Sequence, residues 1–300
     1  MSSLVAGRIA LTIGESRVLR VAPGQQLELP LRIDPASAGA NVASLTTALT
    51  WDATRLTLDS VLASGVGSLT PNTSNAASGS LALSWLNPTG STSQVTVARL
   101  FFTASATSGG TTLLMAPSAL GSESAGNLLS QAVARQTQAC VAPPGNWGDV
   151  NGDGNVNIID AQQIARYSVS LDVARPELVT SQGDVSADDA VNILDAQQIA
   201  RSAVGLSAAA RIGQVAFTLP TLTTVAVTPS AVQMGVGAVQ QFVASPRSAG
   251  DVAWDGCVAT TWSSSSSAAT VDTAGIVSGV SDGDVTITAT AGGVQGTSAV

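Results

Sequence analysis

An eighteen-residue segment occurs twice in this chain, and it restricts the fold more than any other feature. Residues 149–166 read DVNGDGNVNIIDAQQIAR, residues 184–201 read DVSADDAVNILDAQQIAR, and 13 of the 18 positions are identical. Oxygen-bearing side chains recur at positions 1, 3, 5, 9 and 12 of both copies. This spacing is typical of a loop that coils around a hard cation.

The repeated oxygen donors predict two calcium ions, one in each copy. The side-chain ligands expected in the first copy are Asp149, Asn151, Asp153, Asn157 and Asp160, and those in the second are Asp184, Ser186, Asp188, Asn192 and Asp195. Position 7 is expected to add a backbone carbonyl, from Asn155 and Ala190. Three clustered carboxylates in each loop repel one another unless a cation lies between them. The alternatives are two solvated acidic turns without metal, or magnesium, which prefers octahedral geometry and keeps its waters.

The sixth position separates the two loops. Gly154 provides the sharp turn in the first loop, whereas Asp189 occupies that position in the second and must adopt a left-handed backbone. Because Ser186 is also a poorer ligand than Asn151, the second site is predicted to be the weaker.

A short helix is predicted after each loop, beginning at position 12. Ala161, Ile164 and Ala165 form a narrow apolar stripe at helical spacing, and the second copy repeats it. No helix is expected before either loop, so each unit is a loop followed by a helix.

The segments on both sides of the repeat alternate between apolar and polar residues, as strands do. The apolar positions on the N-terminal side include Ile9, Leu11, Ile13, Leu27, Leu29, Leu31, Ile33, Leu45, Leu49, Trp51, Leu81, Leu83, Trp85, Leu100, Phe102, Leu113 and Met115. On the C-terminal side, Val225, Val227, Val239, Gln241, Val243, Val285, Ile287 and Ala289 alternate. The predicted fold is mainly β and multidomain, with an antiparallel jelly-roll β-sandwich, a small α module and an Ig-like β-sandwich.

Composition shifts place the domain boundaries. The expected domains are residues 4–138, 147–206 and 221–300, joined by linkers at 139–146 and 207–220. Residues 148–205 hold 9 acidic and 3 basic groups, so this short stretch carries most of the net charge of −8.

Composition also excludes several functions. All 12 basic residues are Arg, and without His the chain cannot build a Ser-His-Asp or Cys-His nucleophile or a His-ligated metal site. The acidic balance argues against nucleic acid or an anionic membrane as a partner. No apolar run approaches the roughly 20 residues of a membrane span. The two cysteines, Cys140 and Cys257, form either one long-range disulfide or two unpaired thiols.

The paired loop-helix units resemble the type I dockerin family, whose calcium-binding modules dock into cohesin domains of cellulosome-like assemblies. The resemblance covers about residues 147–206 and implies a pair of F-hand units. It also implies partner contacts at loop positions 10 and 11 and at three helix positions. Carried over, these are Ile158, Ile159, Ala165, Arg166 and Ser170, and in the second copy Ile193, Leu194, Ala200, Arg201 and Gly205. For the four aliphatic residues at positions 10 and 11, the alternative is an internal core.

The flanking domains carry weaker resemblances. Residues 4–138 are similar to cohesin or carbohydrate-binding sandwiches through LTTALTWDATRLTLDSV and VARLFFTASA. Residues 221–300 are similar to the bacterial Ig-like group 2 domain through TVAVTPS, TWSSSSSAATVDTAGIVSGV and DGDVTITATAGG.

These resemblances imply a noncatalytic extracellular adaptor or scaffold in a polysaccharide-degrading or cell-surface assembly. Its partner would be a cohesin- or dockerin-bearing protein, or residues 4–138 of the same chain acting as an internal clasp. The alternative is a carbohydrate-binding module attached to a larger secreted enzyme or adhesin, for which Trp51, Trp85, Phe101 and Phe102 are the candidate platform. A glycoside hydrolase is disfavoured, because the four Glu residues form no recognisable pair. No signal peptide is expected, because residues 1–14 lack a basic region and read as the start of a strand.

Overall fold

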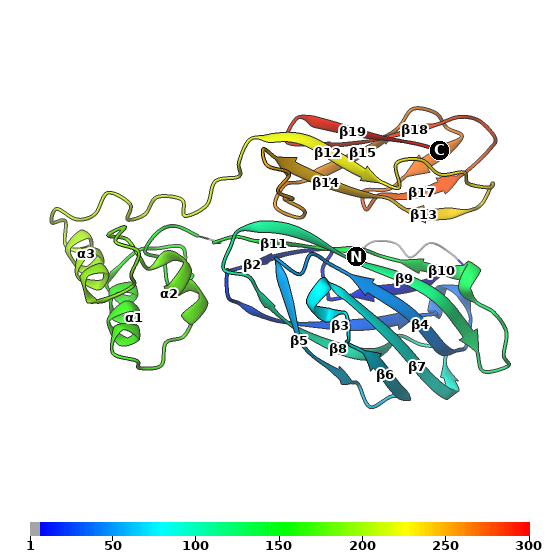
Figure 1. The fold of residues 1–300 in the computed structure, drawn as a ribbon, viewed down its shortest axis with the longest axis horizontal. Helices are drawn as coiled ribbons and strands as arrows, with labels where there is room; N and C mark the ends of the chain where they lie inside the picture. The colour runs from blue at the N-terminus through cyan, green and yellow to red at the C-terminus, as the bar shows by residue number, and fades with distance from the viewer. Residues whose placement is uncertain (1–6, 144) are drawn as a thin grey trace.

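The computed structural model describes residues 7–143 and 145–300, and its described part is mostly β with three α-helices (Figure 1). Residues 1–6, where the first domain was expected to start, lie outside the described residues. None of the described helices has the length and apolar character needed to cross a membrane.

Two sheets form the N-terminal part. Its strands are β1 (Ile9–Ile13), β2 (Val18–Val21), β3 (Gln26–Asp34), β4 (Val42–Thr50), β5 (Leu56–Ala63), β6 (Ser68–Asn72), β7 (Ser80–Ser91), β8 (Val95–Ala104), β9 (Gly109–Ser122), β10 (Ala132–Ala134) and β11 (Thr137–Val141), with single 3-10 turns at Ala36–Ala38, Ala76–Ser78 and Leu129–Gln131. One sheet has the order β10-β1-β3-β8-β5 and the other β2-β11-β9-β4-β7-β6. The pairs β1–β10 and β2–β11 are parallel, so the sandwich is antiparallel except at these two strand pairs.

The sandwich core is formed by the residues whose alternation predicted the strands. Leu45, Leu49 and Leu81 are buried, and Trp51 meets Phe102 edge to face at 5.2 Å between ring centroids. Because side chains point alternately to the two faces of a strand, one apolar face per sheet suffices to fill the space between the sheets.

Three smaller sheets form the C-terminal unit. Its strands are β12 (Leu222–Thr228), β13 (Val239–Gln241), β14 (Val243–Ser248), β15 (Thr260–Ser264), β16 (Ala269–Val271), β17 (Ile276–Gly279), β18 (Thr286–Ala291) and β19 (Val294–Ala299), and the sheets are β12-β14, β13-β17-β16 and β15-β18-β19. The alternation expected across Val239, Gln241 and Val243 is wrong. The chain changes sheet there, and Phe242, between β13 and β14, is the fully buried residue.

Along the chain, the two β units are separated by a helical module with α1 (Ile158–Ser168), α2 (Pro176–Gln182) and α3 (Ile193–Ala203). Its core consists of Val150, Ala161, Ile164, Val179, Val185, Ala196 and Ile199. Helix α2 contradicts the expectation that no helix precedes either loop. Pro176 begins it and Leu178 and Val179 are buried, but a helix of 7 residues is too short to show a helical period in the sequence.

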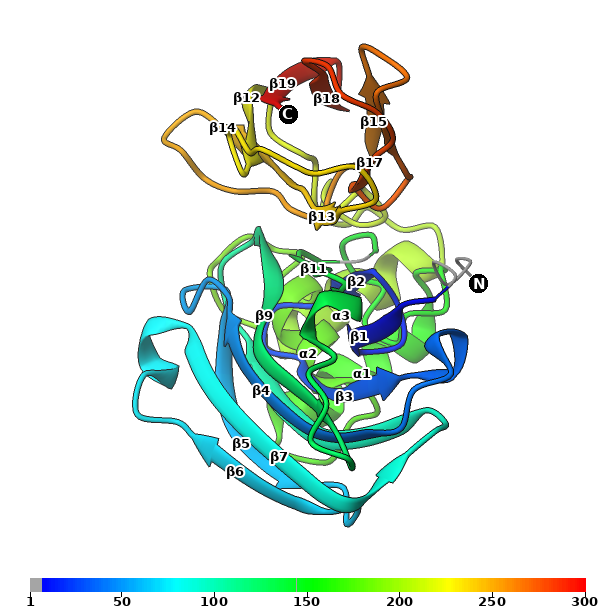
Figure 2. The same cartoon turned by 90° about the vertical axis from the view of Figure 1, so that its right-hand side faces the viewer.

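The C-terminal unit lies against the β2–β11 edge of the sandwich, while the helical module extends from one end (Figures 1 and 2). Cys140 and Cys257 form a disulfide between the two β units, which decides between the two alternatives left open by the sequence. Strand β11 includes residues 139–141, so the sheet continues into the stretch expected to be a linker.

Candidate metal and partner-binding site

The last aspartate of each loop ties the loop to the helix that follows it. Asp160 accepts hydrogen bonds from the backbone N–H groups of Asn157 (2.9 Å), Val150 (3.0 Å) and Asn151 (3.1 Å). The Asn157 side chain in turn accepts from the N–H of Ile159 at 2.8 Å and caps the helix. One carboxylate therefore joins both ends of the loop to the first turn of α1.

The same capping box is present in the second copy. Asp195 accepts from the N–H groups of Ser186 (2.9 Å) and Asn192 (3.0 Å), and Asn192 accepts from Leu194 at 2.7 Å. Helices α1 and α3 consequently begin at loop position 10, two residues earlier than expected. The reason is that the asparagine at position 9 serves as the N-cap and the aspartate at position 12 is the third helical residue.

The first aspartate of each loop holds the turn in shape. Asp149 accepts from the N–H groups of Gly152 (2.8 Å) and Gly154 (3.0 Å), and Asp184 accepts from those of Ala187 (2.7 Å) and Asp189 (3.3 Å). These hydrogen bonds bend the backbone around the carboxylate, so positions 4 and 6 of both loops point their N–H groups inward.

Positions 4 and 6 are left-handed in both loops. The φ angles are +77° at Gly152 and +86° at Gly154, and +62° at Ala187 and +65° at Asp189. The left-handed backbone expected at Asp189 is confirmed. That of Ala187 was missed, although its alignment with Gly152 in the repeat could have revealed it.

The three carboxylates of the second loop converge. The carboxylate oxygens of Asp184, Asp188 and Asp195 lie within 4.8 Å of one another, and no other trio of His, Cys, Asp or Glu among residues 7–143 and 145–300 does so. In the first loop, Asp153 is engaged instead with the Asn151 amide (3.0 Å) and the N–H of Asn155 (2.8 Å). The second loop is therefore better gathered in this structure, although it was predicted to be the weaker site.

The local environment shifts two pKa values in the first loop. Burial raises the pKa of Asp160, against the three backbone N–H groups that favour its charged form. The backbone N–H of Asn155 and the side chain of Asn151 lower the pKa of Asp153. An all-oxygen donor set with clustered carboxylates fits a hard divalent cation such as calcium.

An arginine from the segment after α3 also reaches the second loop. The Arg211 guanidinium donates to the backbone carbonyl of Asp184 at 2.6 Å, lies 3.5 Å from its carboxylate, and stacks over Trp147 at 4.0 Å from the ring centroid. Arg211 was not singled out from the sequence because it lies in the segment expected to be a linker, 207–220.

Apolar side chains at the start of α1 and α3 form an open groove of about 830 Å³. Ile158, Ile159, Ile193 and Leu194 are 50–58% exposed, so the expectation of a surface position holds and the alternative of an internal core is wrong. The groove is lined by Ile158, Ile159, Ala161, Gln162, Ala165, Ile193, Leu194, Ala196, Gln197 and Ala200.

Four of the partner-contact positions implied by the dockerin resemblance do not line the groove. Arg166 donates to the carbonyl of Asp172 (2.9 Å) and Arg201 to that of Ser207 (2.7 Å), so each guanidinium holds the chain after its own helix. Ser170 and Gly205 lie beyond the helix ends. Gln162 and Gln197, which do line the groove, were not singled out from the sequence.

The aromatic platform considered for sugar binding is not present on the sandwich surface. Trp51, Trp85 and Phe102 are at most 6% exposed, and both indole N–H groups donate to backbone carbonyls inside the domain. Phe101 is half-buried. Trp51, Trp85 and Phe102 serve the core, as their alternation indicated.

Comparisons with known proteins agree with two of the resemblances. Residues 147–202 match the family model described as "Dockerin type I domain", and residues 221–300 match "Bacterial Ig-like domain (group 2)". The dockerin match implies calcium binding and a protein-interaction module of the cellulosome type. No curated protein matches the chain.

Several solved structures are similar to part of the chain. The seventh ScaB type I cohesin from Pseudobacteroides cellulosolvens is 15% identical with a TM-score of 0.39, over 45% of this chain and 92% of that one. CaCohA2 from Clostridium acetobutylicum is 19% identical with a TM-score of 0.38, over 46% and 93%. A type I cohesin-dockerin complex from Clostridium thermocellum is 13% identical with a TM-score of 0.38, over 45% and 99%.

Proposed function

We propose that the chain is a noncatalytic, extracellular adaptor that binds a cohesin-bearing protein through the groove between α1 and α3 in a calcium-dependent manner. The observation that carries this proposal is the exposed apolar groove whose two walls each begin directly at an acidic loop. The three proposed domains are residues 4–138, 147–206 and 221–300, and β11 continues the sheet of the first to residue 141.

Two calcium ions are proposed, one in each loop. The side-chain ligands would be Asp149, Asn151, Asp153, Asn157 and Asp160 in the first loop, and Asp184, Ser186, Asp188, Asn192 and Asp195 in the second. The backbone carbonyls of Asn155 and Ala190 would complete the two sites. A bound calcium ion supplies the positive charge that offsets the repulsion between the carboxylates.

The loops and the groove are mechanically connected. Asp160 and Asp195 are buried, and each holds the first turn of its helix to the opposite end of its loop. Ile158, Ile159 and their counterparts stand in that same first turn. Ordering of a loop therefore orders the groove wall, which explains why partner binding should need calcium.

The groove has the chemistry of a protein-binding surface. Fully burying an exposed aliphatic side chain contributes roughly 1.5–3 kcal/mol. Because the four aliphatic residues are about half exposed, a partner that covers them gains about 1 kcal/mol from each. Gln162 and Gln197 also line the groove, and their exposed side-chain amides can form hydrogen bonds with a partner.

A separate partner is favoured over an internal clasp. The module faces the sandwich with α2 and the end of α1, where a cavity is lined by Gln25, Gln26 and Thr103 on one side and Tyr167 and Thr180 on the other. Ile158, Ile159, Ile193 and Leu194 stay exposed, so the described part of the sandwich, from residue 7 onward, does not cover them in this structure. Only residues 142–146 connect β11 to the module. Because five residues span at most about 18 Å, this short linker restricts how far the module can turn its groove toward the sandwich.

The Cys140–Cys257 disulfide supports an extracellular location, because disulfides persist in oxidising compartments. A role in a polysaccharide-degrading or cell-surface assembly is part of the proposal and rests on the dockerin match.

The test is binding of the full chain to a panel of purified type I cohesin domains, with calcium or with a chelator. Binding is expected with calcium only, and Ile159→Asp with Leu194→Asp should abolish it. The matched control is Leu62→Asp, which replaces an aliphatic side chain of similar exposure (53%) on β5. Asp153→Ala with Asp188→Ala should also abolish binding while both β units stay folded. Binding that survives the chelator or the groove variant would refute the proposal.

A further inference from the structure

Two chain segments connect the helical module to the β units, and they pair with each other where they leave the module (Figure 1). The N–H of Trp147 donates to the carbonyl of Gln214 at 2.8 Å, and its carbonyl accepts from the N–H of Gly213 at 2.9 Å. An antiparallel bridge between the two segments adjoins these hydrogen bonds. The neck, as we name this pair, consists of residues 145–147 and 211–216.

The outer ends of the neck are anchored in the core of the C-terminal unit. Phe217 follows the neck directly and packs against Trp254, with 5.5 Å between the ring centroids. Ala142, which precedes the neck, is buried in the same cluster of side chains as Trp254. The neck therefore joins the module to a fixed point on the β units.

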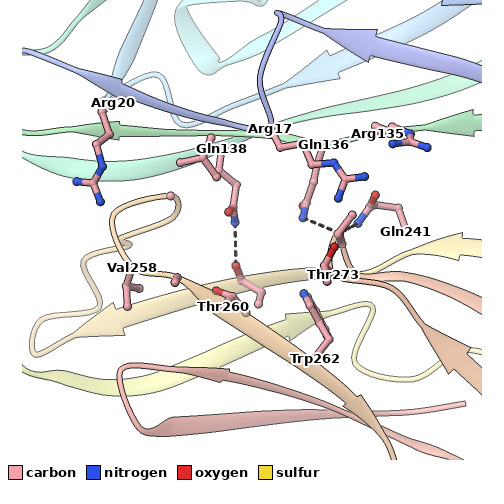
Figure 3. Close-up of a pocket in the computed structure, with 15 residues that line it drawn as sticks. Arg17, Arg20, Arg135, Gln136, Gln138, Gln241, Val258, Thr260, Trp262 and Thr273 are labelled. Carbon is pink, nitrogen blue, oxygen red and sulfur yellow. Dashed lines mark hydrogen bonds between the residues drawn. The ribbon is translucent and has the colours of Figure 1, made fainter. Parts of the chain in front are cut away.

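The two β units are themselves cross-linked. A disulfide joins them, and the Gln138 side chain donates to the carbonyl of Ala244 across their interface at 3.3 Å (Figure 3). A cavity of about 340 Å³ remains between them, with Arg17 and Trp262 in its lining. The β units thus form one body, to which the module is attached.

The module has no comparable ties to the β units. Within the described ranges, 7–143 and 145–300, no hydrogen bond or ion pair joins residues 148–206 to either β unit. Where the module faces the sandwich, a cavity of about 540 Å³ lies between Gln25 and Tyr167. The neck consequently sets the direction in which the module and its groove face.

Arg211 ties the neck to the second loop. Its guanidinium donates to the carbonyl of Asp184 at 2.6 Å and lies 3.5 Å from the Asp184 carboxylate. The same guanidinium stacks over Trp147 of the other neck segment, 4.0 Å from the ring centroid. One side chain therefore contacts both segments of the neck and the first residue of the loop.

Gln182, the last residue of α2, ties the neck to the first loop in a similar way. Its side-chain oxygen accepts from the N–H of Gly145 at 3.0 Å, and its side-chain nitrogen donates to the carbonyl of Asp149 at 3.2 Å. Gln182 is fully buried, so both hydrogen bonds are shielded from water. In both loops, the tie ends at position 1, whose carboxylate is a proposed calcium ligand.

The charges of the second loop connect the state of the neck to the metal. Asp184, Asp188 and Asp195 place three carboxylates within 4.8 Å of one another. A divalent cation offsets two of these negative charges, and the Arg211 guanidinium offsets the third. Without the cation the carboxylates repel one another, and Asp184 leaves the position in which its carbonyl accepts from Arg211. Binding of the cation and closure of the neck therefore stabilise each other.

We propose that the neck is a calcium-dependent hinge, in which Arg211 is the positioning residue. With the second loop occupied, Arg211 holds the neck closed and the groove keeps one direction relative to the β units. When the loop is empty, the tie is lost and the module turns freely about the neck. This inference rests on the proposed calcium site of the second loop, but it does not depend on the identity of the partner.

The test is peptide-resolved hydrogen–deuterium exchange of the full, disulfide-bonded chain, in calcium and in a chelator. The N–H groups of Trp147, Gly213 and Ala216 donate within the neck and should exchange at least about tenfold faster in the chelator, since a hydrogen bond to a charged group is lost. The strands of the β units should be unaffected. Faster exchange in the two loops with an unchanged neck would overturn the hinge alone. Unchanged exchange in both loops and neck would refute the calcium sites as well.

A variant separates the hinge from unfolding of the whole module. In saturating calcium, Arg211→Gln should speed neck exchange about tenfold or more and weaken calcium binding at one of the two sites about tenfold, while α1 and α3 stay protected. The matched control is Arg166→Gln, because Arg166 also donates to a backbone carbonyl, that of Asp172, but lies outside the neck. Equal neck exchange or equal calcium affinity of the two variants would overturn the proposal.

Discussion

Replacement of Ala187 by Gly should stabilise the helical module. Ala187 stands at position 4 of the second loop with φ +62°, where the first loop has Gly152 at +77°. A left-handed backbone costs a non-glycine residue roughly 1–2 kcal/mol. Glycine also makes the unfolded chain more flexible, which offsets about 0.4–1 kcal/mol of the gain from removing this strain. The expected net gain is about 0.5–1 kcal/mol, which raises the melting temperature of a domain this small by roughly 2–8 °C.

Two reverse variants in the first loop complete the experiment. A Cβ added at Gly154 meets nothing within 4 Å, so Gly154→Ala introduces only the cost of a left-handed backbone at a non-glycine residue. This variant should therefore destabilise the module by about 0.5–1 kcal/mol. A Cβ at Gly152 would lie 3.0 Å from Cδ1 of the buried Leu178. Gly152→Ala should therefore lose more than Gly154→Ala.

The assay is thermal unfolding of the full chain in saturating calcium, followed by far-ultraviolet circular dichroism in the helical band. Helices α1, α2 and α3 are the only α-helices of the described residues, so this signal reports on the module rather than on the β units. A lower melting temperature for Ala187→Gly, or a higher one for Gly154→Ala, would refute the argument from backbone strain.

Three further predictions concern the metal, the disulfide and a buried carboxylate. Chelation of the metal should diminish the helical circular dichroism signal, because Asp184, Asp188 and Asp195 lie within 4.8 Å of one another and lose their counter-charge. An unchanged spectrum would argue against bound metal. Replacement of Cys140 and Cys257 by Ser opens a covalent loop with a sequence separation of 117. The free energy of unfolding of the β units, measured by denaturant titration, should fall by about 4–5 kcal/mol. A loss below about 1 kcal/mol would mean that noncovalent contacts alone hold the interface. Burial raises the pKa of Asp255 above its ordinary 3.8, so the folded state holds this proton more tightly and the contribution of Asp255 to stability is lost as pH rises through the raised pKa. Asp255→Asn should flatten this part of the pH-stability profile, and an unaltered profile would contradict the assignment.

The two loops show how much of a structure a local sequence pattern can predict. Asp149 and Asp160 lie 11 positions apart in one continuous segment, so their spacing was enough to predict a coiled loop with its side chains pointing inward. The start of α1 was predicted two residues too late. The signal for its true start was present in the sequence, since Asn157 and Asp160 have the spacing of a capping box. The left-handed backbone at Ala187 was likewise readable from the repeat.

Helix α2 and the exposure of the groove were not predictable in the same way. A helix of two turns is stabilised by the packing of Leu178 and Val179 rather than by its own pattern. Whether Ile159 and Leu194 lie in a core or on a surface depends on how α1 and α3 pack, and their apolar character is compatible with both.

The sequence by itself determined the alternating strands of the N-terminal sandwich core, the two acidic loops and the presence of a helix after each loop, because alternation, ligand spacing and helical periodicity act between residues close along the chain. Only the tertiary structure decided that Cys140 meets Cys257, that Arg211 reaches Asp184, and that residues as distant as Arg17 and Trp262 line one cavity. These contacts join segments more than 25 residues apart, and most join different domains. Their formation depends on the packing of whole sheets against one another, which no local pattern records.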